Sequence, residues 1–185
     1  LGDPEDFKLP AFRRLLLNGI LWCLHDPVPP LSPEPMDYAG SWQTMPVPGT
    51  WEDNSEGRLA RYDGFAWYRC RVEIPAAWRG QELQLEVSDV DNVDEAFVNG
   101  VKVGSAGSPP PNYTNASAIK GNYPIAAPLT GQDQGLWIAL RVYDHDGRGG
   151  FKGAAPSVHR GDESIKLAGQ WDFRTGDDAT WSKYD

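Results

Sequence analysis

The side chains best suited to chemistry gather in one short segment, residues 143–153, which reads YDHDGRGGFKG. It holds the carboxylates of Asp144 and Asp146, the imidazole of His145, two cations and four glycines. Glycine lets a backbone approach a ligand closely, and carboxylates beside cations supply both acceptors and donors of hydrogen bonds. The segment therefore predicts a polar binding loop. An equally weighted interpretation is a turn that satisfies itself through an internal salt bridge.

A second acidic segment, residues 89–95, places five oxygen-bearing side chains within seven residues. Alternating carboxylate and amide oxygens suit calcium, and the candidate ligands are Asp91, Asn92 and Asp94. The glycine spacing of an EF-hand is absent from this segment. The favoured interpretation is a solvated start of a strand, whose carboxylates cap backbone amides. Calcium is the one cofactor that the sequence suggests.

The sequence lacks the motifs of several enzyme classes. There is no G-x-S-x-G nucleophile elbow, no phosphate loop and no dinucleotide fingerprint. The three histidines are scattered singly, and no second acid-rich loop matches Asp144 and Asp146 as a pair for glycoside hydrolysis. The chain on its own is therefore expected to be non-catalytic.

The composition argues against some classes of partner and favours one. The chain has 185 residues, a net charge of −9 and no cluster of lysine and arginine that could follow phosphates, which argues against nucleic acid. It has no window near the roughly 18 uninterrupted apolar residues that a membrane span needs. The 8 Trp and 7 Tyr, combined with acids and amides, are typical of carbohydrate sites, although most such rings belong to a core.

The chain divides into segments of different periodicity. Apolar spacing between residues 12 and 24 predicts a helix within an N-terminal segment 1–28, and a proline-rich linker follows over residues 29–38. Residues 39–170 are expected to form the main domain. Residues 171–185 are expected to run out toward another domain of the same polypeptide.

Beyond the linker the pattern is all-β, and we expect an antiparallel β-sandwich. Alternating runs predict strands at residues 65–74, 82–87, 95–98, 101–103, 136–143 and 163–167. Asn99-Gly100 is a strong hairpin turn signal. In the first strand Tyr68 shares its face with apolar residues and Trp67 with charged ones, so Tyr68 is expected to be the buried ring.

Four blocks then resemble a known family: PGTWE at residues 48–52, YDGFAWYR at 62–69, VDNVDEAFVNG at 90–100 and RVYD at 141–144. Their order and spacing are similar to the galactose-binding-like jelly roll. That module stands at the front of family 2 glycoside hydrolases and occurs in sialate O-acetylesterase-like proteins. Residues 3–28 look like the last helix of a ThuA-like domain.

The resemblance implies that several loops meet at one end of the sandwich. It brings Trp51, Glu52 and Asp63 to the end that carries the loop from Asp144 to Phe151. A stacking ring with acidic and basic groups suits a sugar. The candidate ligand-binding residues are Trp51, Glu52, Asp63, Asp144, Asp146, Arg148 and Phe151.

We therefore expect a non-catalytic carbohydrate-binding module of a larger protein, bacterial and secreted or periplasmic. Its partners are then an oligo- or polysaccharide and the other domains of the same polypeptide. Two alternatives stay open: a spacer domain without a ligand, and an accessory part of a hydrolase or esterase active site that a further domain completes.

Overall fold

The structure is a computed structural model that describes residues 12, 15, 16, 20, 38–132 and 135–183. The chain divides into two compact units, Leu1–Pro35 and Met36–Asp185. Residues 12, 15, 16 and 20 are helical, and the remainder of the expected N-terminal helix, with nearly all of the linker, lies outside the described residues. No helix in the described residues is long and apolar enough to cross a membrane.

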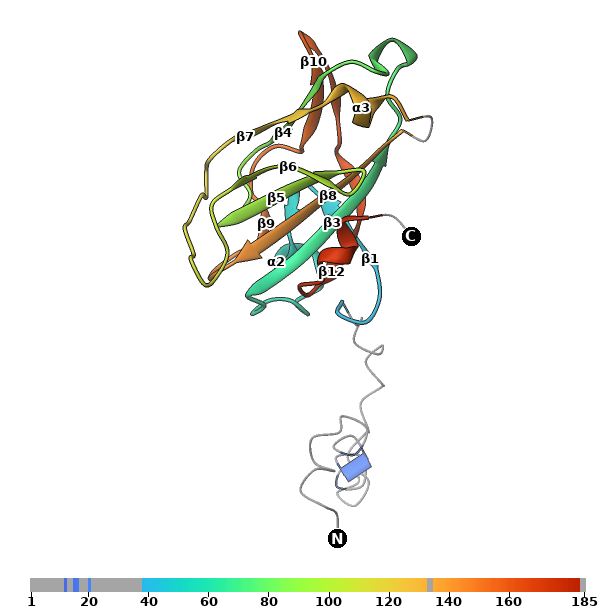
Figure 1. The fold of residues 1–185 in the computed structure, drawn as a ribbon. Helices are drawn as coiled ribbons and strands as arrows, with labels where there is room; N and C mark the ends of the chain where they lie inside the picture. Colours follow the sequence, from blue (N-terminus) through green and yellow to red (C-terminus); the bar gives the residue numbers. More distant parts are fainter. Residues whose placement is uncertain (1–11, 13–14, 17–19, 21–37, 133–134, 184–185) are drawn as a thin grey trace. The chain divides into compact units, whose positions relative to one another are not determined.

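The second unit consists of short strands and single helical turns (Figure 1). In chain order these are β1 (Gln43–Val47), β2 (Gly49–Thr50), α2 (Trp51–Asn54), β3 (Gly64–Val72), η2 (Ala76–Trp78), β4 (Leu83–Val87), β5 (Val93–Val98), β6 (Val101–Ala106), β7 (Gly121–Ile125), α3 (Ala127–Thr130), β8 (Leu136–Asp144), β9 (Gly150–Phe151), β10 (Ser157–Arg160), β11 (Glu163–Lys166), β12 (Gly169–Thr175) and η3 (Ala179–Ser182).

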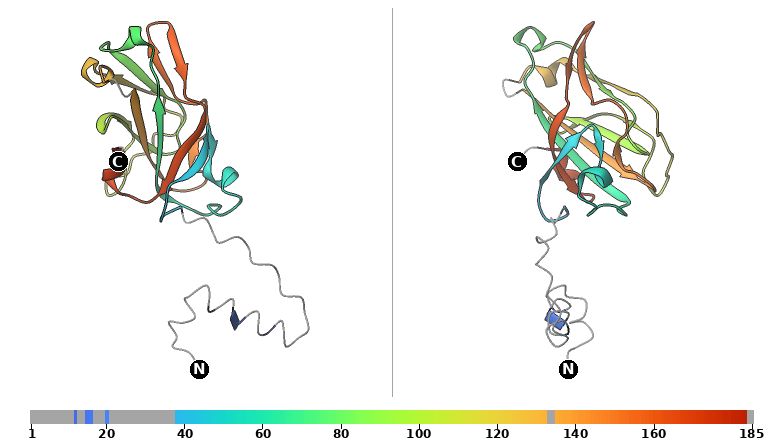
Figure 2. Two further views of the ribbon diagram at one scale, coloured as in Figure 1. Left: turned by 90° about the vertical axis from the view of Figure 1, so that its right-hand side faces the viewer. Right: turned by 180° about the vertical axis from the view of Figure 1, so that it is seen from behind.

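The strands form an all-β sandwich, as expected from the alternating pattern. One sheet has six strands in the order β1-β12-β3-β8-β5-β6, and the other has four in the order β11-β10-β4-β7. A two-stranded ribbon, β2-β9, joins segments about 100 residues apart in the chain. The described pairings are all antiparallel, which allows the short turns that connect several of them. Figure 2 shows the same strands from the side and from behind.

Residues 171–185 were expected to lead away from the sandwich toward another domain. This prediction is wrong for residues 171–175, which belong to β12 inside the larger sheet. Its residues pair with β1 on one side and with β3 on the other. Trp171 and Phe173 point into the core and are 2% and 0% exposed, because alternate residues of a strand share one face. The chain beyond β12 is also attached, since the side chain of Arg69 donates to the carbonyl of Lys183 over 3.2 Å.

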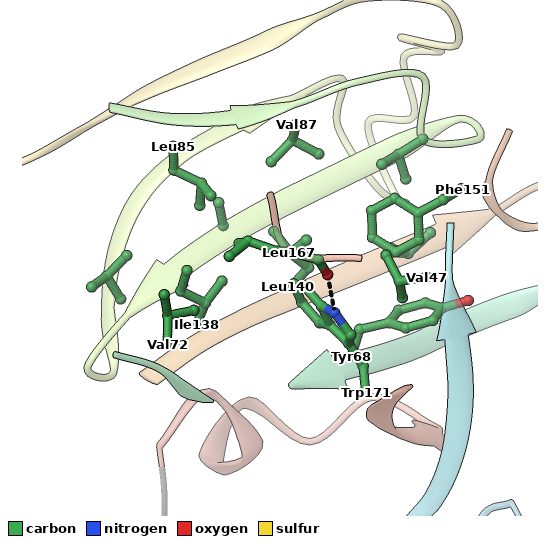
Figure 3. Close-up of a cluster of buried hydrophobic side chains, with 14 of the residues drawn as sticks. Val47, Tyr68, Val72, Leu85, Val87, Ile138, Leu140, Phe151, Leu167 and Trp171 are labelled. Atoms are coloured by element: carbon green, nitrogen blue, oxygen red, sulfur yellow. Dashed lines mark hydrogen bonds between the residues drawn. The ribbon is translucent and has the colours of Figure 1, made fainter. Parts of the chain in front are cut away.

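The core lies between the two sheets and follows from the period of two in each strand. Leu85 and Val87 of β4 face Ile138 and Leu140 of β8, as Figure 3 shows. Trp171 lies beside them and its indole Nε1 donates to the carbonyl of Leu167 over 2.8 Å. These side chains are almost wholly removed from water, so packing between the sheets holds the sandwich together.

The prediction that Tyr68 is the buried ring and Trp67 the exposed one is only half correct. Tyr68 is fully buried between the sheets, in edge contact with Phe151 and Phe173. Trp67 points to the opposite face, but it is also 0% exposed. On that outer face its ring lies 5.4 Å from the ring of Phe97, and its strand neighbours are arginines, whose long side chains cover a surface that the sequence suggested was open.

The turn between β5 and β6 confirms the hairpin signal. Asn99 and Gly100 have φ values of 50° and 78°, the left-handed region that a tight hairpin turn requires. The Asn99 side chain also does more than favour the turn. Its amide donates to the carbonyl of Leu129 over 2.9 Å, and its carbonyl oxygen accepts from the backbone amide of Trp137 over 2.8 Å. Asn99 thus fixes the start of β8.

Replacing Asn99 with alanine is expected to lower the free energy of unfolding by about 2 kcal/mol, since it removes two hydrogen bonds and leaves alanine at a positive φ. Urea unfolding followed by circular dichroism measures the change. Asn122→Ala on the exposed face of β7 is the matched control, with a change of less than about 0.5 kcal/mol. Equal effects for the two variants would contradict the assigned role.

Candidate functional site

Three segments meet at one end of the sandwich and define the candidate site. Gly49 and Thr50 of β2 pair with Phe151 and Gly150 of β9, and the backbone amide of Trp51 donates to the carbonyl of Gly149 over 3.1 Å. The segment 88–92 joins them: the amide of Asp91 donates to the carbonyl of Gly150 over 3.0 Å. The corner before β3, the loop after β8 and the loop after β4 are thereby held side by side.

Trp51 is not available as a stacking ring, which corrects its expected role. The residue is 0% exposed, its ring lies 5.8 Å from that of Tyr62, and its indole donates to the carbonyl of Tyr62 over 3.2 Å. The one-turn helix α2 turns it inward, beginning at the cap residue Thr50. Phe151 is likewise 1% exposed and packs on Tyr68, so neither ring can cover the face of a sugar.

The glycines of the loop are required by close approach. A Cβ atom on Gly149 would lie 1.8 Å from the Trp51 ring, inside its van der Waals surface. Gly150 has a φ of 100°, and a Cβ there would lie 2.8 Å from the hydroxyl oxygen of Tyr68. These glycines seat the loop on the core, so their spacing is explained by packing without reference to a ligand.

Beside this corner lies an open groove of about 440 Å³. Two of its charged side chains, Asp53 and Arg148, form an ion pair with a distance of 2.9 Å and are both more than half exposed. A third, Lys152, is 37% exposed and bonded at 2.5 Å to the buried carboxylate of Asp91. The full lining is Pro48, Gly49, Thr50, Asp53, Arg148, Phe151, Lys152 and Gly153. The groove presents both donors and acceptors to water.

Asp144 is the most unusual residue of the site. It is the last residue of β8, points inward and is 0% exposed, and apart from the nearby backbone amide of Asp146 its carboxylate has no hydrogen-bond partner among the described residues. Burial, together with the negative charges of Asp91, Asp63 and Glu52, raises the pKa of Asp144 to about 7, against a lowering by the backbone amide of Asp146. A buried carboxylate in such surroundings is costly when ionised.

The other predicted site residues surround Asp144 at different depths. Glu52 is half-buried and accepts from the backbone amide of Gly149, with both oxygens 3.2 Å away. Asp63 and Asp146 are exposed. The structure therefore brings all seven predicted residues to one end of the sandwich, with Arg148 and Phe151 on the groove and Asp144 buried at the end of β8.

The three residues expected to bind calcium do not form a common site. The Asp91 carboxylate accepts from the hydroxyl of Ser117 over 2.7 Å and pairs with Lys152. Asp94 points between the sheets, where the Tyr123 hydroxyl donates to it over 2.8 Å, and burial raises the pKa of Asp94 to about 6. In residues 38–132 and 135–183, no three His, Cys, Asp or Glu side chains are placed to hold a metal ion.

Sequence reasoning missed two rings that stand beside the loop. Tyr113 and His145 stack with their centroids 4.6 Å apart and their planes 26° apart. Tyr113 comes from the long connection between β6 and β7, about 30 residues away in the chain. The charges of Asp146 and Asp91 add to a desolvation effect that raises the pKa of Tyr113. No local pattern points to this contact, because it depends on how two distant loops fold.

Comparison with known proteins gives partial likenesses only. No protein-family model and no curated protein matches the chain. Among solved structures, it is similar to a Bacteroides uniformis β-glucuronidase (18% identity, TM-score 0.46, covering 77% of this chain and 16% of that one). It is also similar to a Ruminococcus gnavus β-glucuronidase (19%, 0.43, 54% and 16%) and to an Eisenbergiella tayi GH2 β-galacturonidase bound to glycerol (18%, 0.42, 62% and 22%). The chain thus corresponds to less than a quarter of each of these proteins.

Proposed function

We propose that the chain is a non-catalytic carbohydrate-binding module of a larger carbohydrate-active protein, and that the sugar lies in the groove beside β2 and β9. The observation that carries the proposal is this groove, with its exposed carboxylate, guanidinium and ammonium groups above glycine backbone. Its volume of about 440 Å³ falls in the range of small-ligand sites. Hydroxyl groups both donate and accept, so a polyol can use Asp53 and Arg148 at once.

The groove predicts weak binding. Its one aromatic residue, Phe151, is buried, so little ring surface is offered to the apolar face of a pyranose. Each hydrogen bond between a hydroxyl and a charged group contributes about 1.5–3 kcal/mol, and two or three of them place the dissociation constant between roughly millimolar and micromolar. A module of this kind gains useful affinity through the protein that carries it.

The setting of the module is also part of the proposal. Four sequence blocks resemble the galactose-binding-like jelly roll of family 2 glycoside hydrolases, which supports a parent enzyme of that kind. We place this parent in a bacterium, secreted or periplasmic, with residues 1–28 as the tail of a ThuA-like domain. Its other domains are then the macromolecular partners of the sandwich.

Two other roles remain as outcomes of the test. The Asp53–Arg148 ion pair satisfies both groups without a ligand, which favours a spacer domain. A groove that is open on one side also suits an accessory role, in which a further domain completes the active site of a hydrolase or esterase. Saccharide binding by this chain alone would distinguish the carbohydrate-binding module from the spacer and from the accessory role.

Isothermal titration of the chain with neutral and uronic-acid oligosaccharides tests the proposal. Arg148→Gln is expected to weaken binding of the best saccharide about tenfold, which corresponds to about 1.4 kcal/mol for one charge-assisted hydrogen bond. Arg160→Gln, which changes an arginine on β10 that pairs with Glu163, is the matched control and should leave binding unchanged. Absence of binding across the panel would favour the spacer, and equal loss in both variants would place the site elsewhere.

A further inference from the structure

A buried pair of residues, Asp91 and Asn92, lies in the segment between β4 and β5, beside the loops that form the groove. The two residues are 2% and 4% exposed. The side-chain amide of Asn92 donates to Asp91 Oδ1 over 3.2 Å, and both side chains bond to the hydroxyl of Ser117, from the connection between β6 and β7. Because buried polar groups are costly to leave unpaired, these bonds fix the pair in one arrangement.

Asn92 fixes the start of the loop that carries Arg148. Its side-chain oxygen accepts from the backbone amide of His145 over 2.5 Å. At the other end of the loop the amide of Gly149 donates to the carboxylate of Glu52. The residues from His145 to Arg148 are exposed, so little packing holds them, and Arg148 lines the groove. Asn92 and Glu52 thus anchor the loop on either side of Arg148.

Asp91 fixes the other cation that lines the groove. Its Oδ2 lies 2.5 Å from the ammonium of Lys152, while its Oδ1 accepts from the hydroxyl of Ser117 over 2.7 Å. Its backbone amide also donates to the carbonyl of Gly150 over 3.0 Å. The buried pair is therefore bonded to Lys152 directly and to the loop of Arg148 through its first residue.

The backbone around the pair is held in a conformation that side chains rarely adopt. Asn92 has a φ of 59°, Asp89 a φ of 51° and Ala118 a φ of 64°. The amide of Ala118 donates to the carboxylate of Asp89 over 3.2 Å, which joins the two strained segments. Asparagine and aspartate tolerate this left-handed region, whereas alanine enters it where the surrounding structure imposes it. Strain of this kind gathers at functional sites, which favours a role for the pair beyond packing.

We propose that Asn92 is a positioning residue of the groove, which acts through His145 to hold Arg148 in place while Asp91 holds Lys152. Asn92 is buried, so its effect on a ligand passes through Arg148. A site whose groups are already in place binds more tightly, because less freedom is lost on binding. The effect on affinity rests on the proposed carbohydrate function, whereas the ordering of the loop by Asn92 does not.

Isothermal titration of the whole chain compares Asn92→Gly with Asn99→Gly. These two asparagines flank β5, both have a positive φ that glycine also adopts, and both side-chain oxygens accept from a backbone amide at an end of β8. Asn92→Gly is expected to weaken binding of the best saccharide about tenfold, and Asn99→Gly to leave it unchanged. In the Arg148→Gln background Asn92→Gly should add little, because the group that it positions is then missing.

A second measurement needs no saccharide. The ¹H–¹⁵N heteronuclear NOE reports backbone order on the picosecond to nanosecond timescale. Asn92→Gly is expected to lower it at residues 146–148, and Asn99→Gly to leave it unchanged. Ser117→Ala should act like Asn92→Gly, since the Ser117 hydroxyl accepts from both the backbone and the side-chain amide of Asn92, and Ser117→Thr should restore the order because it keeps a hydroxyl.

Unchanged order at residues 146–148 in Asn92→Gly would overturn the proposal. A loss of affinity for Asn92→Gly that is equally large with and without Arg148→Gln would also overturn it, since Asn92 would then act elsewhere. If Asn92→Gly does not fold, Ser117→Ala and Ser117→Thr decide, and equal order in both rejects the role of Asn92. Absence of saccharide binding by the unaltered chain would reject the proposed function alone, and the NOE would then decide whether Asn92 holds the loop.

Discussion

Replacing Trp51 with alanine is expected to lower the free energy of unfolding by about 3–5 kcal/mol, in the range found for large aromatic side chains removed from a core. The ring is fully buried, touches the rings of Tyr62 and Phe173, and supports Gly149 from below. Its loss leaves a cavity under the loop and removes the indole hydrogen bond to Tyr62. Urea unfolding followed by circular dichroism measures the change.

Trp181 provides the matched control for this substitution. It is half-buried on the outer face, where it packs against the Arg174 guanidinium and the ring of Trp42. Trp181→Ala should cost much less than Trp51→Ala, because less of its surface leaves water on folding. If Trp51→Ala kept its stability and lost only saccharide binding, the structural role given to Trp51 would be wrong. The ring would then contact the sugar, as the sequence suggested.

Replacing Asp144 with asparagine is expected to raise the free energy of unfolding at pH 8 by about 2–4 kcal/mol, because it removes a buried charge that the backbone amide of Asp146 offsets only in part. The folded-state pKa of about 7 lies above that of the unfolded chain, so the folded protein holds the proton more tightly. The contribution of Asp144 to the free energy of unfolding is therefore most favourable at low pH. It falls as the pH rises from about 4 to 7.

Thermal or urea unfolding between pH 4 and 8 measures this difference. The gain from Asp144→Asn should shrink below pH 7 and approach zero near pH 4, where the carboxyl is largely neutral in both the folded and the unfolded chain. Asp162→Asn, at an exposed turn, should show no such pH dependence. A variant less stable than the original chain at pH 8 would mean that the Asp144 charge has a favourable partner.

A carboxylate that weakens the fold at neutral pH calls for an explanation beyond stability. Residues that are costly to keep are common at functional sites, where the surrounding structure holds them in place. Asp144 is the last residue of the strand that leads into the loop carrying Arg148, and its position therefore supports a functional role for this end of the sandwich.

Strands with strong alternation could be predicted from the sequence, and weakly patterned ones could not. Residues 136–143 and 65–74 correspond closely to β8 and β3, which lie in the middle of the larger sheet. β12 also alternates, with Trp171, Phe173 and Thr175 buried, but the glycines and acids around it resemble a linker. β7 contains Pro124 and lies at a sheet edge, where a missing amide is tolerated. Such strands are defined by their partners in the sheet.

The site shows the same limit. The resemblance to the galactose-binding-like jelly roll implied that these loops meet at one end, and the pairing of β2 with β9 holds them there. The orientation of Trp51 depends on the single helical turn that Thr50 caps, and no pattern distinguishes a ring turned inward from one turned outward at a corner. The stacking of Tyr113 on His145 joins loops about 30 residues apart, so it too depended on the folded structure.

The central claim is that a sugar binds in the groove beside β2 and β9. The most direct test is an amide NMR titration of the whole chain with the saccharide panel. The account predicts that the largest shifts fall on Asp53, Arg148, Lys152 and Gly153, that they saturate between roughly micromolar and millimolar ligand, and that Arg148→Gln weakens them. Shifts confined to the outer face around Trp42 and Trp137, or no shifts with any saccharide, would contradict it.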